Sequence, residues 1–354
     1  MSNKEDLIRA IGAEIKMRKS ELPKLHLETI YFGGGTPSLL SDKEIGFLFE
    51  TISEHFDIRN DAEITLEANP DDLTVAKIKQ LKNSPINRLS IGIQSFRDQD
   101  LKTMNRAHNA DEAERSVKVS QDIGITNITA DLIYGLPEQS LNDWRSNLHK
   151  LIALDVPHLS SYCLTVEPKT ALAQLVKTGQ IVPATEQISS DHFHTLVEET
   201  TKAGFEHYEI SNFAKEGFIA VHNSSYWKGE PYLGVGPSAH SFAGNTRKWN
   251  VANNSTYMKS IFANETAYEQ ETLSISEQYN ERVMLGLRAK WGVDHARISN
   301  DFGANYATHF KREIQPWIKS GDAITSNGIT TLTQQGRLLA DRIASSAFFV
   351  NDPK

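Results

Sequence analysis

The chain contains 354 residues, of which 39% are hydrophobic, and it carries a formal net charge of −8 at pH 7. This length suits one large domain with a smaller one, and the negative charge argues against a general nucleic-acid binder. No segment approaches the roughly 18 consecutive apolar residues of a membrane span. The start of the chain is a charged amphipathic pattern without the apolar core of a signal peptide, so we expect a cytoplasmic protein.

Short runs rich in β-branched residues alternate with segments of helical spacing through the first 213 residues. The predicted strands are 28–32, 63–68, 88–94, 128–135 and 158–164, with a sixth candidate at 206–213. Helical spacing occurs at 41–56, 74–83, 111–123, 140–154 and 186–203. This alternation predicts parallel βα units. Since the strands are too few for an eightfold barrel, we expect a partial barrel over residues 1–213.

The remaining chain has two parts with different patterns. Residues 214–270 are rich in Gly, Asn, Pro and aromatic residues, so we expect an irregular segment, which in a compact protein usually has a function. From residue 271 helical spacing returns, and two short strands flank Asn327-Gly328, a strong hairpin signal. A last helix is expected over 333–346. These elements predict a small winged-helix-like α+β domain over 271–354, without the basic stripe of a DNA-binding domain.

Polar residues follow the predicted strands at their carboxyl ends, where βα barrels place their functional groups. Each has a structural explanation of its own: the glycines after the first strand can make a tight turn, Glu67 can cap a helix, and Asp131 can bind backbone amides. With Gln94 after the third strand and Tyr162 in the fifth, five strand ends in succession are polar. Five are harder to explain in this way, because burying them costs stability unless they are paired or bind a ligand. The sequence therefore predicts a ligand site at this end of the barrel.

Several segments resemble, in order, the motifs of the radical S-adenosylmethionine (SAM) proteins related to oxygen-independent coproporphyrinogen III oxidase. They are IYFGGGTPSLL, ITLEANPDDLT, RLSIGIQSF with MNRAH, DLIYGLPEQS and LSSYCLTVEP. The later HNSSYWKGEPYLGVGPSAHSF (222–242) resembles the HNxxYW segment of the HemW haem chaperone branch. The resemblance extends from about residue 5 to the C-terminus. It implies an α/β fold, a partial (β/α)6-type barrel that holds SAM against a [4Fe-4S] cluster and that lacks its first strand in this chain.

The resemblance implies where the methionine and ribose parts of SAM would bind. Gly34, Gly35 and Thr36 would hold the methionine end, since glycine lets backbone groups approach a ligand without a Cβ between them. Glu67 would accept hydrogen bonds from the ribose hydroxyls, because a carboxylate offers two acceptor oxygens to a diol.

Four further positions of the SAM site are implied by the same motifs. Gln94, Arg106 and Asp131 match SAM-contacting positions of the family, and Arg106 would pair with the SAM carboxylate. Cys163 lies where the family has a small residue beside the adenosine, so we interpret it as a thiol of the pocket wall and not as a cluster ligand.

Within the HNxxYW segment, His222 is the candidate haem ligand, since neutral imidazole is a common axial ligand. Tyr226 and Trp227 would either stack on a porphyrin face or pack the mouth of the barrel. The resemblance thus implies haem as a ligand and haem-acceptor proteins as partners, with peripheral membrane association through an acceptor.

The chain departs from the family at the cluster. Family members carry a CxxxCxxC loop whose three thiolates bind the cluster, whereas Cys163 is the only cysteine here and so gives the cluster no anchor. Two explanations are open, and we favour the first: Met1 is an internal start within a longer gene, or the protein is a shortened paralogue.

Three functions follow from these patterns. The first is a haem chaperone that transfers haem to acceptor proteins on a radical SAM scaffold. The second is a coproporphyrinogen III dehydrogenase, which the HNxxYW segment disfavours. The third is a metal-dependent barrel hydrolase using His192 and His194, which is disfavoured because two residues two positions apart on a helix point to different faces.

Overall fold

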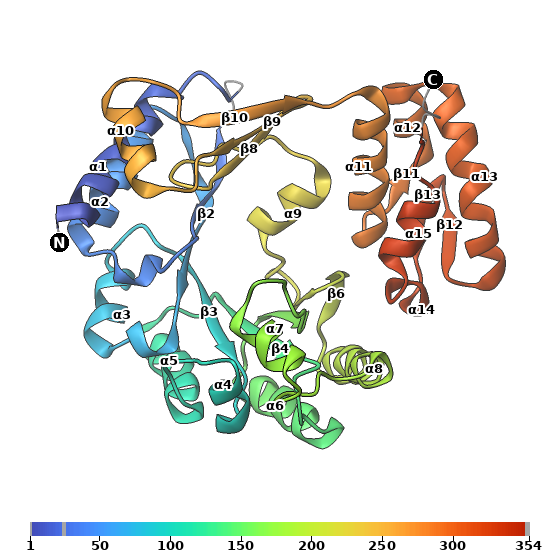
Figure 1. The fold of residues 1–354 in the computed structure, drawn as a ribbon, viewed down its shortest axis with the longest axis horizontal. Helices are drawn as coiled ribbons and strands as arrows, with labels where there is room; N and C mark the ends of the chain where they lie inside the picture. Colours follow the sequence, from blue (N-terminus) through green and yellow to red (C-terminus); the bar gives the residue numbers. More distant parts are fainter. Residues whose placement is uncertain (1, 23–25, 351–354) are drawn as a thin grey trace. The chain divides into compact units, whose positions relative to one another are not determined.

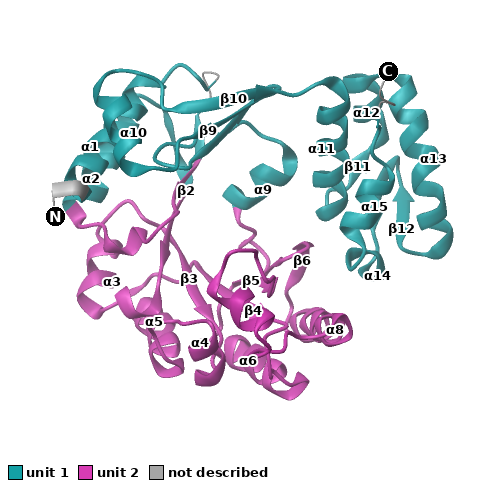
Figure 2. Cartoon of the chain, viewed as in Figure 1, with its two compact units in different colours: residues 1–28, 43–62, 221–354 teal, residues 29–42, 63–220 magenta. Residues whose placement is uncertain are grey.

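The computed structural model describes residues 2–22 and 26–350 (Figure 1). The chain divides into two compact units (Figure 2). Unit 1 contains residues 1–28, 43–62 and 221–354, and unit 2 contains residues 29–42 and 63–220. This division crosses the predicted domain ranges 1–213, 214–270 and 271–354, which stay a prediction.

Unit 2 contains most of a seven-stranded sheet with the order β1-β2-β3-β4-β5-β7-β6. The strands are β1 (Leu27–Phe32), β2 (Ile58–Ala68), β3 (Arg88–Gln94), β4 (Ile128–Tyr134), β5 (His158–Cys163), β6 (Glu206–Glu209) and β7 (Asn212–Ala214). Strands β2 to β5 are parallel to one another, whereas β7 is antiparallel to both β5 and β6. The predicted parallel βα units are thereby confirmed, and the sixth candidate strand is in fact the hairpin β6–β7.

Helices connect the parallel strands of unit 2. They are α3 (Val75–Lys82), α4 (Asp98–Thr103), α5 (Ala110–Ile123), α6 (Leu141–Ala153), α7 (Ala171–Lys177) and α8 (Glu186–Lys202), with short 3₁₀ turns η1 (Pro37–Leu39) and η2 (Pro70–Asp72). Capping boxes begin α5 at Asn109 and α6 at Ser140, which satisfies backbone N–H groups that a helix start leaves unpaired. The core between sheet and helices includes the fully buried Leu89, Ile91 and Trp144.

Residues 214–270 are not irregular as expected. They contain α9 (Val221–Lys228), β8 (His240–Ala243), β9 (Thr246–Asn250), α10 (Asn254–Phe262) and β10 (Tyr268–Thr272). The three strands form an antiparallel sheet with the order β10-β9-β8. The sequence hides these strands because they are short and rich in polar residues, so they show no regular apolar alternation.

The rest of unit 1 contains α1 (Ser2–Met17), α2 (Asp42–Ser53) and the C-terminal elements. These are α11 (Ile275–Arg288), β11 (Val293–Asp294), α12 (His295–Phe302), α13 (Ala304–Ser320), β12 (Ala323–Ser326), β13 (Ile329–Leu332), α14 (Gln334–Arg337) and α15 (Ala340–Ser346). Asn327 and Gly328 join β12 to β13 with φ values of 51° and 79°, the left-handed backbone of a tight hairpin turn. The predicted helices around a hairpin are confirmed. Within residues 2–22 and 26–350, no helix has both the length and the apolar character to span a bilayer.

Candidate functional site

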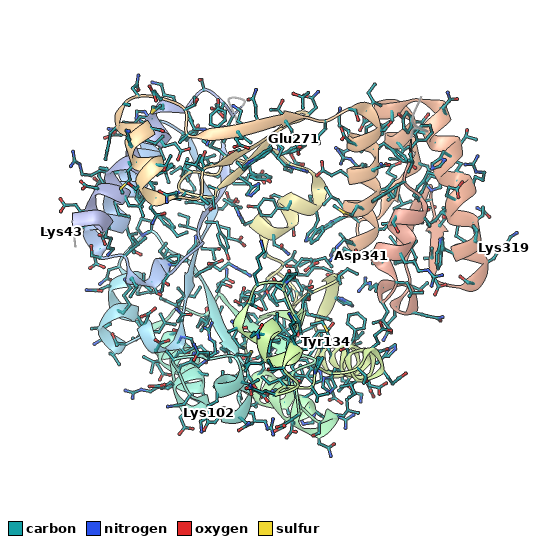
Figure 3. The ribbon with its side chains drawn as sticks, viewed as in Figure 1. Lys43, Lys102, Tyr134, Glu271, Lys319 and Asp341 are labelled. Carbon is teal, nitrogen blue, oxygen red and sulfur yellow. The ribbon has the colours of Figure 1, made fainter. Side chains whose placement is uncertain are left out.

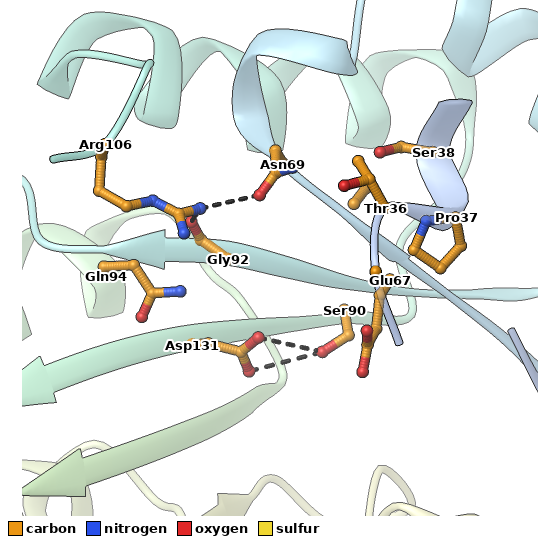
Figure 4. Close-up of a pocket in the computed structure, with 12 residues that line it drawn as sticks. Thr36, Pro37, Ser38, Glu67, Asn69, Ser90, Gly92, Gln94, Arg106 and Asp131 are labelled. Atoms are coloured by element: carbon orange, nitrogen blue, oxygen red, sulfur yellow. Dashed lines mark hydrogen bonds between the residues drawn. The ribbon is translucent and has the colours of Figure 1, made fainter. Parts of the chain in front are cut away.

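A pocket opens at the carboxyl ends of the parallel strands in unit 2 (Figure 4). Its lining residues come from the turn after β1 and from β2, β3, β4 and the loop after α4: Gly35, Thr36, Pro37, Ser38, Glu67, Ala68, Asn69, Ser90, Gly92, Gln94, Arg106 and Asp131. The strand ends predicted to carry a ligand site therefore meet in one place. Six of the predicted SAM-site residues line this pocket, and Gly34 adjoins it.

The triple glycine after β1 leads into the pocket, and its last residue, Gly35, is one of the lining residues. Gly34 and Gly35 have φ values of 75° and 70°, which residues with a Cβ rarely adopt, and no other atom lies within 4 Å of where their Cβ atoms would be. At Gly33 an added Cβ would lie 2.5 Å from the Tyr31 ring, so that position has no room for a side chain. Gly33 thus allows close packing, whereas Gly34 and Gly35 leave open space.

Glu67 at the end of β2 is oriented by two hydrogen bonds. The Tyr31 hydroxyl donates to Glu67 Oε1 at 2.8 Å, and the Gly34 amide donates to Glu67 Oε2 at 3.1 Å. Burial and the neighbouring Glu67 charge raise the Tyr31 pKa, so this hydroxyl keeps its proton and remains a donor. The carboxylate is therefore fixed between β1 and its turn, at the rim of the pocket.

Asp131 on β4 is the second carboxylate that lines the pocket. Ser90 Oγ on β3 donates to Asp131 Oδ1 and Oδ2 at 3.4 and 3.3 Å (Figure 4). Burial, and then the Glu67 charge, raise the Asp131 pKa to about 7. At neutral pH this carboxyl group is therefore present in both protonation states and can accept or donate a hydrogen bond.

Arg106 provides the positive charge of the pocket. Its Nη2 donates to Asn69 Oδ1 at 2.8 Å and to the Gly92 carbonyl at 3.1 Å, which leaves other guanidinium N–H groups for a ligand. Gln94, at the end of β3, has a φ of 66° and follows a register shift between Ile91 and Gln94. Left-handed backbone at a non-glycine residue costs about 1–3 kcal/mol and is often found at functional sites.

Not every predicted SAM-site residue lines the pocket. Cys163 is exposed at the end of β5 and is not among the lining residues; its Sγ lies 3.2 Å from where a Cβ of Gly135 would be. Conversely, Asn69 and Ser90 line the pocket but were not predicted to bind SAM. Both lie close to a predicted site residue: Asn69 follows Glu67 by two residues at the end of β2, and Ser90 on β3 is hydrogen-bonded to Asp131 on the neighbouring β4.

The HNxxYW segment forms helix α9 of unit 1. His222 Nε2 and the Tyr226 hydroxyl are 3.0 Å apart, one helical turn from each other, and their rings meet edge to face with centroids 5.0 Å apart. Burial lowers the His222 pKa to about 4, so its imidazole is neutral at physiological pH. A neutral imidazole carries a nitrogen lone pair and is the form that binds a haem iron or another metal.

Tyr226 and Trp227 point to different neighbours. The Tyr226 ring lies 4.7 Å from the Tyr232 ring, centroid to centroid, and is 38% exposed. Trp227 instead packs against α11, where the Arg288 guanidinium lies 5.4 Å from its ring centroid. Among the described residues Trp227 Nε1 is buried and has no hydrogen-bond partner. The structure therefore brings Tyr226, but not Trp227, onto the His222 face of α9.

The residues that would support a metal-dependent hydrolase do not form a metal site. His192 is buried in unit 2, where its Nδ1 accepts a hydrogen bond from the Gly135 amide at 3.2 Å. Across residues 2–22 and 26–350, no group of three or more His, Cys, Asp or Glu side chains is arranged to hold a metal ion. Cys163 is the only cysteine of the sequence, so the residues present do not supply the three thiolates that a [4Fe-4S] cluster of this family needs.

Comparison with known proteins agrees with this geometry. The radical SAM superfamily model matches residues 11–151, and the HemN C-terminal domain model matches residues 273–339. The haem chaperone HemW of Bacillus subtilis is 33% identical over 341 residues, which cover 96% of this chain and 90% of that protein. HemW of Lactococcus lactis is 35% identical over 288 residues, which cover 81% of this chain and 76% of that protein.

Among solved structures, coproporphyrinogen III oxidase (HemN) from Escherichia coli, a radical SAM enzyme, superposes with a TM-score of 0.82. The superposition covers 97% of this chain and 83% of that one, at 22% identity, so it shows a shared fold. The predicted partial radical SAM barrel with a small C-terminal domain is thereby confirmed. The extent and identity of the sequence matches show that the chain belongs to the HemW family of radical SAM proteins.

Proposed function

We propose that this protein binds haem on the His222 face of α9 and transfers it to acceptor proteins. The observation that carries this proposal is the state of His222: an imidazole that burial keeps neutral, beside an aromatic surface that is partly open to solvent. The similar proteins of Bacillus subtilis and Lactococcus lactis are named haem chaperones, which supports the same ligand. Transfer requires a site that can release haem, and a single histidine on a half-exposed helix is suited to exchange.

Haem titration of the purified full chain tests the ligand. Wild-type protein should shift the Soret absorption of haem with saturation, and His222→Ala should lose that shift. His240→Ala distinguishes an alternative, because His240 is an exposed histidine at the start of β8. His149→Ala, an exposed histidine paired with Glu199 in unit 2, is the matched control. If His222→Ala and wild type bind haem with the same spectrum and affinity, His222 is not the ligand.

Transfer is tested separately from binding. Haem-loaded protein is mixed with a haem-free globin, and the appearance of the globin spectrum is followed over time. The proposal expects transfer faster than from free haem at the same concentration. Haem that stays on the chain after equilibration with excess haem-free globin would contradict a chaperone role while leaving haem binding intact.

We further propose that the pocket of unit 2 binds SAM. Its chemistry supports this: open backbone at Gly34, Gly35 and Thr36 for the amino acid end, and Arg106 for the carboxylate. Glu67 would accept from the ribose diol, with Gln94 and Asp131 contacting the rest of the nucleoside. In this proposal the pocket residues bind and orient SAM. Cys163 is not included, because it does not line the pocket.

A further inference from the structure

The small sheet β10-β9-β8 has two different faces. Successive residues of a strand point to opposite faces, and residues directly opposite each other on antiparallel strands share a face. One face packs against α1, where Asn250 Nδ2 donates to Glu14 Oε1 at 2.8 Å. Just beyond the end of α1, Arg18 Nη2 donates to Ser241 Oγ and Lys248 Nζ donates to Glu21 Oε2, each at 2.9 Å. The neighbours of Ser241 and Lys248 along their strands, Phe242 and Arg247, therefore point to the opposite face.

That other face carries a row of aromatic side chains that ends in a cation. Phe242 pairs with Tyr232 on one side and with Arg247 on the other, so all three side chains share a face. The Tyr232 and Phe242 rings lie 6.4 Å apart. Through the contact of Tyr232 with Tyr226 the row continues to His222 on α9. Burial raises the pKa of Tyr232, and the positive charge of Arg247 opposes this rise, so Arg247 acts electrostatically on the row.

Arg247 is held in place by two carboxylates. Its Nη2 donates to Glu281 on α11, and its Nη1 donates to Glu271 at 3.3 Å. Glu271 is the next residue along the row, because it pairs with Arg247 in the register of β9 and β10 (Figure 3 labels Glu271). The Glu271 side chain is 48% exposed, whereas Glu281 is 22% exposed. An exposed ion pair contributes only about 0–1 kcal/mol, so a carboxylate ligand can replace Glu271.

We infer that Arg247 binds a propionate carboxylate of the porphyrin and that Tyr232 and Phe242 contact the porphyrin plane. This inference rests on the proposed haem binding and assigns residues outside the HNxxYW segment. A haem has a flat apolar ring with two carboxylates at one edge. The row offers the complementary order: the His222 imidazole, aromatic rings, and then a guanidinium whose fork geometry matches a carboxylate.

The test compares haem with its dimethyl ester, in which both propionates lack charge. Arg247→Gln should weaken haem binding about tenfold to a hundredfold, since it removes a charge-assisted hydrogen bond, and should leave dimethyl ester binding within twofold. Glu271→Gln should have the opposite sign and strengthen haem binding, because it removes the competing carboxylate. Arg297→Gln on α12, an exposed arginine paired with Asp301, is the control.

The outcomes distinguish failure of this inference from failure of the proposed haem binding on which it rests. If wild-type protein binds neither haem nor the ester, the proposed function fails. If wild type binds haem and Arg247→Gln binds it equally well, only the propionate assignment fails. Equal loss of haem and ester binding in Arg247→Gln would also overturn the assignment, because it would show that Arg247 supports the fold of the site and does not recognise charge.

Discussion

Tyr31 on β1 donates a hydrogen bond to Glu67 on the neighbouring β2, with 2.8 Å between Tyr31 Oη and Glu67 Oε1. The two residues are 36 positions apart in the chain, and neither orients the other until the sheet has formed. A free glutamate side chain loses conformational entropy when it binds a ligand, and this contact removes part of that cost in advance.

Removing the Tyr31 hydroxyl should therefore weaken SAM binding without abolishing it. Tyr31→Phe leaves the Gly34 amide as the only donor of this pair, and we expect the Kd for SAM to rise about threefold to tenfold. Glu67→Gln should raise it about tenfold to a hundredfold, because it exchanges a charged acceptor for a neutral one. Isothermal titration with SAM measures both, and Glu216→Gln, exposed in unit 2, is the control. Unchanged affinity in Glu67→Gln would contradict the ribose assignment.

Gly35 should be required for binding beyond its effect on the backbone. Gly35→Ala and Gly179→Ala place a Cβ at φ values of 70° and 72°, each in open space of unit 2. Both should destabilise the fold by about 1–2 kcal/mol, since left-handed backbone disfavours a Cβ. Only Gly35→Ala should also weaken SAM binding, by tenfold or more, measured by the same titration. Equal SAM affinity in the two variants would contradict a role of Gly35 in binding SAM.

The stability of the protein should fall as pH rises through the range in which Asp131 ionises. Its pKa in the folded chain is raised from 3.8 to about 7 by burial and by Glu67. Between about pH 4 and 7 the folded state thus binds a proton that the unfolded state has lost, so raising the pH favours unfolding. Asp131→Asn should remove this dependence. The difference between the thermal midpoint of Asp131→Asn and that of wild type should therefore be more positive at pH 8 than at pH 5. Asp155→Asn, at an exposed surface pair, should behave as wild type.

Haem binding through His222 should be insensitive to pH near 6.5, where an ordinary histidine titrates. Burial lowers the pKa of His222 from 6.5 to about 4, so the imidazole stays neutral down to about pH 5. We expect the haem affinity at pH 5.5 to lie within twofold of that at pH 7.5, and to fall only when the imidazole is protonated near pH 4. Spectrophotometric titration checks this. A decline centred on pH 6.5 would assign ligation to a more exposed histidine.

Glu14 should be essential for the stability of unit 1. It is buried and accepts four hydrogen bonds, from Arg18 at 2.8 Å, Asn250 at 2.8 Å, the Gly236 amide at 2.7 Å and the Tyr257 hydroxyl at 2.6 Å. Glu14→Ala leaves the buried Arg18 charge without this partner, and should lower the free energy of unfolding by about 3–5 kcal/mol.

Urea unfolding followed by circular dichroism measures this loss. Asp6→Ala, which breaks the exposed pair of Asp6 and Arg9 at 3.4 Å, should cost about 1 kcal/mol or less. A loss within that same range for Glu14→Ala would show that the surrounding residues rearrange to satisfy Arg18.

Sequence patterns were sufficient where local spacing decides structure. The predicted strand 88–94 and helix 111–123 agree with β3 and α5 to within a residue. The Asn327-Gly328 turn was equally local, since two residues with positive φ determine it. The residues at the strand ends could be named in advance because parallel strands bring their carboxyl ends to one edge.

The sequence by itself thus determined the family, the parallel sheet and most of the pocket that faces its carboxyl ends. Only the tertiary structure decided that 206–213 is a hairpin, that 214–270 contains a sheet, and that Trp227 turns away from His222. It alone placed Arg247 at the end of the aromatic row. The physical reason is the range of the interactions: Glu14 and Tyr257, 243 residues apart, hold α1 and α10 together, and α1 covers one face of short polar strands. Those strands have no apolar periodicity of their own, so their two faces differ only after α1 has packed on one of them.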